Sequence, residues 1–278
     1  MSEQEGFKSR GDTKIFVRTW LPEGRARAAV VLVHGFKSHS GFYEWPGRAL
    51  AREGFAVSAL DLRGHGRSEG DRLFVDSFGD YVADVDGTVA LAKARHPGLP
   101  VFLLGHSAGG VVACLYALDH GGEIAGLISE SFAYELPAPE FALAVLKGIG
   151  KIAPHAHVLS LKSEDFSRDP EYVARMNSDT LIPTFGYPAQ TVAELVRADA
   201  RLRAEFSTIT VPVLILHGTA DKAAKPHGSQ RFHESAGSTD KTLTLYDGYF
   251  HDLLNDVGKE RVLADITRWI TTRLPKVA

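Results

Sequence analysis

The sequence predicts an α/β fold: a mostly parallel twisted sheet, helices on both faces and a helical insertion. Three observations lead to this prediction. Short apolar runs alternate with helical patterns along most of the 278 residues, which is typical of a sheet covered by helices. Several of these runs are apolar without alternation, as in strands buried on both faces. The segment 132–206 then interrupts the alternation, which indicates an insertion.

Seven apolar runs are predicted to be strands. The first two, 14–20 and 28–34, are joined by a Pro-Glu-Gly turn, and we expect them to be antiparallel because the connection is too short for a crossover. The other five runs lie at 55–61, 101–105, 124–129, 211–217 and 242–246. Helical patterns separate them at 41–53, 76–95, 108–120, 226–235 and 259–274.

The interrupting segment 132–206 contains helical pieces punctuated by prolines, such as 140–149 and 191–198. We interpret it as a helical cap on a core domain made of 1–131 and 207–278, placed over the carboxyl ends of the strands where open α/β sheets bind ligands. The stretch 139–152 is apolar on more than one face. It fits either a lid helix that contacts lipid surfaces or a helix that packs the cap against the core.

Composition excludes several classes of protein. A net charge of -3 gives no electrostatic reason to expect a nucleic acid partner. The single cysteine, Cys114, rules out an internal disulfide and fits a reducing compartment. The first ten residues have no apolar signal region, and no later run is long enough to span a bilayer. We therefore expect a cytoplasmic protein.

The strongest local motif is GHSAGG at 105–110, directly after an apolar run and directly before a helical pattern. A serine between a strand and a helix sits on a sharp turn that presents its hydroxyl above the sheet, and the flanking glycines avoid clashes with neighbouring backbone. The helix N-terminus beneath it favours negative charge. The motif therefore predicts Ser107 as a nucleophile.

A serine nucleophile needs a base, and the base needs an orienting carboxylate, from later strand ends. Asp221 follows the run 211–217, and His251 follows the run 242–246. The order Ser, Asp, His agrees with a nucleophile on such a strand-to-helix turn. We predict Ser107, Asp221 and His251 as a catalytic triad.

Three other carboxylates lie near the predicted site in the sequence. Glu130 ends the run 124–129 and is an alternative triad acid. Asp247 and Asp252 lie too close to His251 in the chain to orient it from a separate loop, and we expect both to be exposed.

Four further histidines lie where a structural, catalytic or metal-binding role has to be considered. His34 and His106 lie beside glycines of the two predicted active-site loops, and we interpret them as structural neighbours of the site. His155 and His157 form an H-x-H pair without a third ligand at a fitting spacing. We predict neither a metal nor a cofactor.

An acyl-transfer site also needs two backbone donors for the tetrahedral oxyanion. One is predicted to be the N–H of Ala108, at the start of the helix after Ser107. The second is predicted to be the N–H of Phe36, which follows Gly35 in the loop after the run 28–34.

These motifs together resemble the monoacylglycerol lipase and lysophospholipase branch of the α/β hydrolases. The resemblance rests on the segments 34–35 with 39–43, 61–70, 105–110, and 217–221 together with 246–251. It implies an α/β-hydrolase fold, and hydrolysis of carboxylic esters of lipid-like alcohols under a mobile apolar cap. The chain departs from the family pattern at Lys37 and Ser38, where the family usually has glycine and glutamate, and at Ala108, where it usually has methionine.

The predicted function is a serine esterase or lipase that forms an acyl-enzyme on Ser107. Its partner is a small-molecule or lipid ester, with transient contact of the cap with lipid surfaces. A thioesterase or an aminopeptidase-like amidase with the same triad is the alternative enzyme, and a non-catalytic binding protein of the same fold is the alternative outside enzymes. The preferred acyl chain, the alcohol and the oligomeric state stay open at this point.

Overall fold

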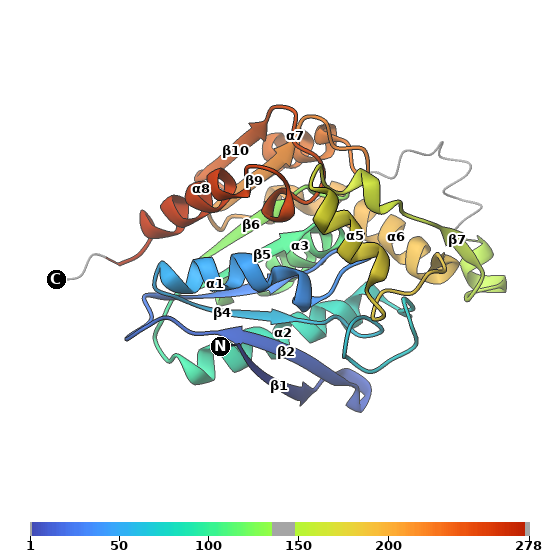
Figure 1. Cartoon of the computed structure of the whole chain (residues 1–278), viewed down its shortest axis with the longest axis horizontal. Coiled ribbons are helices and arrows are strands. Elements are labelled where there is room, and N and C mark those ends of the chain that lie inside the picture. Colours follow the sequence, from blue (N-terminus) through green and yellow to red (C-terminus); the bar gives the residue numbers. More distant parts are fainter. Residues whose placement is uncertain (1, 135–147, 276–278) are drawn as a thin grey trace.

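The computed structural model describes residues 2–134 and 148–275 and has the predicted α/β architecture (Figure 1). Within the described residues, eight strands form one sheet in the order β1-β2-β4-β3-β5-β6-β9-β10. Their bounds are Glu3–Lys8 (β1), Lys14–Trp20 (β2), Ala28–Val33 (β3), Phe55–Leu60 (β4), Val101–His106 (β5), Gly126–Glu130 (β6), Val213–Gly218 (β9) and Lys241–Tyr246 (β10). All strand pairs from β4 to β10 are parallel.

The first two predicted strands, β2 and β3, run in opposite directions as expected, but they do not pair. β4 lies between them, antiparallel to β2 and parallel to β3. Trp20 of β2 and Val30 of β3 both face Val57 of β4 in the register. The edge strand β1 was not predicted, because its residues are mostly polar and its side chains are largely exposed.

Both faces of the sheet are buried, which explains the apolar runs without alternation. Along β3, Ala29, Val31 and Val33 pack into one hydrophobic cluster, while Val30 and Leu32 pack into the other. The first cluster lies under α2 (Phe78–Arg95), α3 (Ala108–His120), α6 (Ala189–Glu205) and α7 (Pro226–Ser235). The second lies under α1 (Glu44–Arg52) and α8 (Lys259–Thr271).

Local chemistry fixes several helix ends. The side chain of Ser77 accepts a hydrogen bond from the Gly79 N–H at the start of α2, which supplies a partner for a backbone donor that the helix cannot satisfy itself. α5 (Pro170–Ser178) begins in the same way, with Asp169 accepting from the Glu171 N–H and with proline in the first turn. α7 also begins with proline, at Pro226.

The segment 132–206 contributes α5, α6 and a small antiparallel pair of strands, β7 (His157–Leu159) and β8 (Tyr187–Pro188). The predicted helical piece 191–198 lies inside α6. Of the pieces 140–149 and 139–152, the residues before 148 lie outside the described residues, and 148–152 are helical. The β7–β8 pair was not predicted, because two or three residues are too few to give a periodic pattern.

α6 ties this segment to the core. The Thr191 hydroxyl accepts from the Val75 N–H and donates to the Leu73 carbonyl, and Glu194 accepts from the Phe78 N–H. In Figure 1, α5, α6 and β7 gather at one end of the sheet. Among the helices that the structure describes, none combines the length and the hydropathy that crossing a membrane requires.

Candidate active site

Ser107 lies at the junction between β5 and α3, in a conformation that non-glycine residues rarely adopt. Its φ is 56° and its ψ is -122°, and such backbone costs about 1–3 kcal/mol. A Cβ on Gly105 would lie 2.4 Å from the Gly109 carbonyl oxygen, and a Cβ on Gly109 would lie 2.4 Å from the His34 carbonyl oxygen. Both glycines of the motif are therefore required by close backbone approach.

The structure brings the three predicted triad side chains into one hydrogen-bonded chain. His251 Nε2 lies 2.8 Å from Ser107 Oγ, and His251 Nδ1 lies 2.7 Å from Asp221 Oδ2. Ser107 follows β5, Asp221 follows β9 and His251 follows β10, so all three are held at the carboxyl ends of parallel strands. The side chains of Asp221 and His251 are almost completely buried, which strengthens their interaction.

Asp221 is held as a carboxylate by its surroundings. Burial alone would raise its pKa, but nearby His251 and His217 and the hydrogen bonds from both rings hold the pKa below its ordinary value. Its Oδ1 accepts from the N–H groups of Ala223 and Ala224, at 2.8 and 2.9 Å. Its other oxygen, Oδ2, lies 2.7 Å from His251 Nδ1 and 3.0 Å from His217 Nε2. The contribution of His217 was missed, because its partnership with Asp221 is not visible as a motif.

The two segments that carry the predicted oxyanion donors both adjoin Ser107. Ala108 is the first residue of α3, so its N–H is one of the helix donors without an intrahelical partner. A Cβ on Gly35 would lie 2.7 Å from Ser107 Cβ, so the loop that carries Phe36 runs directly against the serine. The donor roles of Phe36 and Ala108 stay predictions.

His34 and His106 are buried beside this site and are hydrogen-bonded or packed as neighbours. Nε2 of His34 accepts from the Leu62 N–H at 3.0 Å, and the His106 ring lies 4.9 Å from the His251 ring. Burial lowers the pKa of each to about 4, so both are neutral at neutral pH. These contacts fit their interpretation as structural neighbours rather than bases.

The alternative acid Glu130 does not contact the base. Its Oε1 accepts from the Leu254 N–H at 3.0 Å, while Asp221 occupies the Nδ1 side of His251. Glu130 therefore supports the loop that carries His251 rather than its ring.

The expected exposure of Asp252 is wrong, since this residue is buried. Its carboxylate accepts hydrogen bonds from the Tyr172 hydroxyl and from Asn255 Nδ2. The sequence could not show this, because Tyr172 comes from the distant α5. Asp247 is exposed, as expected.

Asp252, Glu130 and His106 bring ligand-type atoms within 4.8 Å of one another. Both oxygens of Asp252 accept hydrogen bonds, whereas Glu130 Oε2 and both ring nitrogens of His106 are buried without a hydrogen-bond partner among the described residues. The two residues of the H-x-H pair lie in other contacts: His155 stacks on Phe74 and His157 stacks on Phe185.

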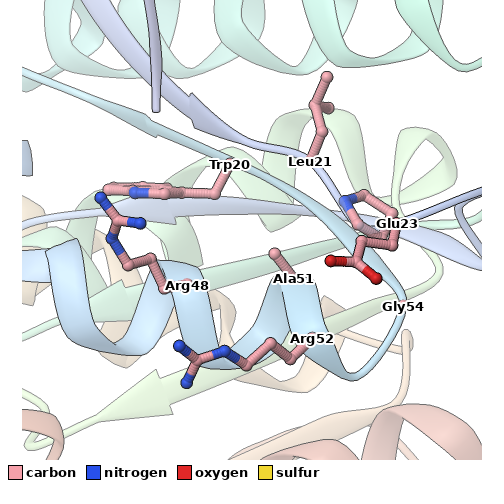
Figure 2. Close-up of a pocket in the computed structure, with 8 residues that line it drawn as sticks. Trp20, Leu21, Glu23, Arg48, Ala51, Arg52 and Gly54 are labelled. Atoms are coloured by element: carbon pink, nitrogen blue, oxygen red, sulfur yellow. The ribbon is translucent and has the colours of Figure 1, made fainter. Parts of the chain in front are cut away.

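Two cavities differ in their relation to the site. A cavity of about 60 Å³ joins Lys37, next to Phe36, to residues 159–161 and 182–187 of the inserted segment. A larger hollow of about 280 Å³ is shown in Figure 2, between the end of β2 and α1. It is lined by charged side chains such as Glu23, Arg48 and Arg52 and contains none of the predicted site residues. The smaller cavity also contains none of the predicted site residues, but Lys37 in its lining directly follows Phe36 in the chain.

Comparison with known proteins gives a consistent result. Residues 24–258 match the family described as serine aminopeptidase, S33. The chain is 32% identical to the monoacylglycerol lipase of Mycolicibacterium smegmatis over 98% of each sequence. It is 35% identical to the monoglyceride lipase of Homo sapiens, over 93% of this chain and 87% of that protein. The crystal structure of Paleococcus ferrophilus monoacylglycerol lipase superposes with a TM-score of 0.83 at 30% identity, covering 93% of this chain and 99% of that one.

Proposed function

The chain belongs to the serine aminopeptidase S33 family of α/β hydrolases, and on that premise we propose that it hydrolyses monoacylglycerol-like or lysophospholipid-like esters through an acyl-enzyme on Ser107. It is a carboxylic ester hydrolase. The relatives that support the ester substrate are named as lipases, and this favours ester over amide hydrolysis despite the family's name. The thioesterase and amidase alternatives and the non-catalytic alternative find no such support.

The observation that supports this proposal is the contact chain from Ser107 Oγ through His251 to Asp221, with both hydrogen bonds shorter than 3 Å. His251 Nε2 takes the hydroxyl proton as Ser107 attacks the ester carbonyl, and it returns the proton to the leaving alcohol. Water then cleaves the acyl-enzyme by the same route. Asp221 stays ionised, fixes the imidazole tautomer and stabilises the imidazolium.

The oxyanion that forms at the carbonyl accepts hydrogen bonds from the N–H groups of Phe36 and Ala108. Each such donor contributes about 3 kcal/mol to the stability of the transition state. The N-terminus of α3 adds a favourable partial charge at the same point.

We further propose that residues 132–206 form a cap with a lid function over the acyl site. Ile152, Val158 and Phe185 are large apolar residues of this segment that are exposed to solvent. Such residues favour transient contact with a lipid surface, where the substrate is concentrated. A cytoplasmic location is supported by the one cysteine, Cys114, which is buried as a free thiol.

The decisive experiment compares the wild type with Ser107→Ala on monoacylglycerols of increasing acyl length, p-nitrophenyl esters and aminoacyl amides. The wild type is expected to hydrolyse the esters and to react with one equivalent of a fluorophosphonate, whereas Ser107→Ala loses about 10⁶-fold in kcat. Retention of most esterase activity by the variant, or turnover of amides alone, contradicts the proposal.

A further inference from the structure

We propose that Tyr187 is a positioning residue that holds the oxyanion loop, residues 34–38, in its active shape from within the inserted segment. This inference rests on the proposed function, because it concerns the loop that carries the predicted donor Phe36. Tyr187 belongs to β8, far from that loop in the chain, and only 3% of its surface is exposed.

The hydroxyl of Tyr187 binds the oxyanion loop at a strained point. The Lys37 N–H donates to the Tyr187 oxygen at 2.5 Å. Lys37 itself has a φ of 55°, which is unfavourable for a residue with a Cβ and persists only when its surroundings hold it. The bond therefore anchors the peptide unit directly after Phe36. Because the Phe36 N–H must point at the oxyanion, the orientation of this neighbouring peptide sets the donor geometry.

A directional hydrogen-bond chain fixes the hydroxyl of Tyr187 in turn. Burial lowers the pKa of His65 to about 3, so the ring is neutral and has one donor and one acceptor. Its Nδ1 lies 3.1 Å from the Arg63 carbonyl and donates to it, which leaves Nε2 as the acceptor, 3.3 Å from the Tyr187 hydroxyl. Tyr187 thus donates to His65 and accepts from Lys37. Burial also raises the pKa of Tyr187, so it keeps its proton.

Ring packing and a second tether reinforce the hydrogen bonds. The ring of Tyr187 stacks on that of Phe36, with centroids 4.0 Å apart and planes 18° apart. The ammonium group of Lys37 donates to the Leu161 carbonyl at 2.8 Å, so the inserted segment holds both the backbone and the side chain of Lys37. These contacts couple the position of the inserted segment to the shape of the oxyanion loop.

The test is Tyr187→Phe, which keeps the ring on Phe36 and removes only the hydroxyl. We expect kcat for a soluble ester to fall about tenfold, with KM changed less than twofold, because removal of a complete oxyanion donor costs about 10²–10³-fold and this variant only misplaces one. The affinity for phenylboronic acid, which forms a tetrahedral adduct with the serine, is expected to fall by the same factor.

The matched control is Tyr81→Phe. Tyr81 is also buried and packs near His65, but its hydroxyl has no hydrogen-bond partner among the described residues. We expect its kcat and boronate affinity to equal those of the wild type. Tyr187→Phe with unchanged kcat and unchanged boronate affinity overturns the inference, whereas an active Ser107→Ala overturns the proposed function instead.

If Tyr187→Phe does not fold, its effect is measured in a protein that also carries Lys37→Gly. Lys37→Gly relieves the strained backbone and keeps the N–H donor, so Lys37→Gly/Tyr187→Phe is measured against Lys37→Gly. Because glycine removes part of the strain that the hydroxyl holds, the expected loss is smaller than tenfold: a kcat at least about twofold lower in the double variant supports the inference, and an equal kcat overturns it.

Discussion

His251 Nε2 lies 2.8 Å from Ser107 Oγ, although 144 positions separate the two residues in the chain. If they act as one unit, removing either should cost about as much as removing both. We expect His251→Ala to lower kcat about 10⁶-fold and the double variant with Ser107→Ala to lose no more. Steady-state kinetics on a p-nitrophenyl ester measures this. Losses that multiply in the double variant would show that the two groups act independently.

Asp221→Asn is expected to lower kcat about 10⁴-fold, because an amide in place of the carboxylate favours the wrong tautomer of His251.

The same change alters how the stability of the protein depends on pH in the acid range. The pKa of Asp221 is lowered in the folded state by its histidine partners, so its contribution is present above the ordinary pKa of about 4 and is lost as the pH falls.

Urea unfolding between about pH 3 and pH 7 measures the second effect. The wild type is expected to lose more stability on acidification than Asp221→Asn does. If the free energy of unfolding falls equally in the two proteins as the pH is lowered, Asp221 is not held as a carboxylate by the fold.

Glu130 is expected to change the stability of the protein with pH in the direction opposite to Asp221. Burial, with the nearby charge of Asp252, raises the pKa of Glu130 well above its ordinary value, so the folded protein keeps a proton that the unfolded chain releases. The free energy of unfolding therefore decreases as the pH rises from about 4.3, the ordinary pKa of glutamate, towards the raised pKa. Glu130→Gln stays neutral and can still accept from the Leu254 N–H.

We expect Glu130→Gln and the wild type to be equally stable near pH 4, and the variant to be more stable by about 1 kcal/mol or more near pH 8. Chemical unfolding at both pH values measures this. Activity serves as the control, since Glu130 does not contact His251 in the described structure and kcat at pH 7 should change little. A less stable variant at pH 8 would show that Glu130 is ionised in the folded protein.

The fold was predictable where local residues mark the boundaries. α3 and α7 have the predicted bounds, because Ser107 lies at the turn before one and Pro226 begins the other. The edge strand β1 was not predictable, since it contributes almost no buried apolar surface. The position of β4 between β2 and β3 is a long-range pairing that no local pattern contains.

The site was predictable where chain order and motif agree. The ends of the predicted strands point to Ser107, Asp221 and His251, and the structure brings their side chains into contact, while their catalytic roles stay predictions. The partners of Asp252 and Lys37 were not predictable. Tyr172 and Tyr187 reach these residues only after the inserted segment has folded against the core, and neither contact has a signature in sequence spacing.

The last prediction concerns the exposed apolar residues of the inserted segment. Ile152 is 88% exposed and Phe185 is 43% exposed, and neither contributes to the hydrophobic clusters of the core. If they contact lipid, Ile152→Ser/Phe185→Ser should lower hydrolysis of a monoacylglycerol in vesicles severalfold, because each removed side chain forfeits about 1.5–3 kcal/mol of burial at most. Hydrolysis of a water-soluble short-chain ester should stay the same, since the residues of the contact chain are untouched. Leu245→Ser is the control, because Leu245 is similarly exposed but lies on β10 rather than in the inserted segment. Equal losses on both substrates, or an equal loss in the control, would assign these residues to folding stability instead of lipid contact.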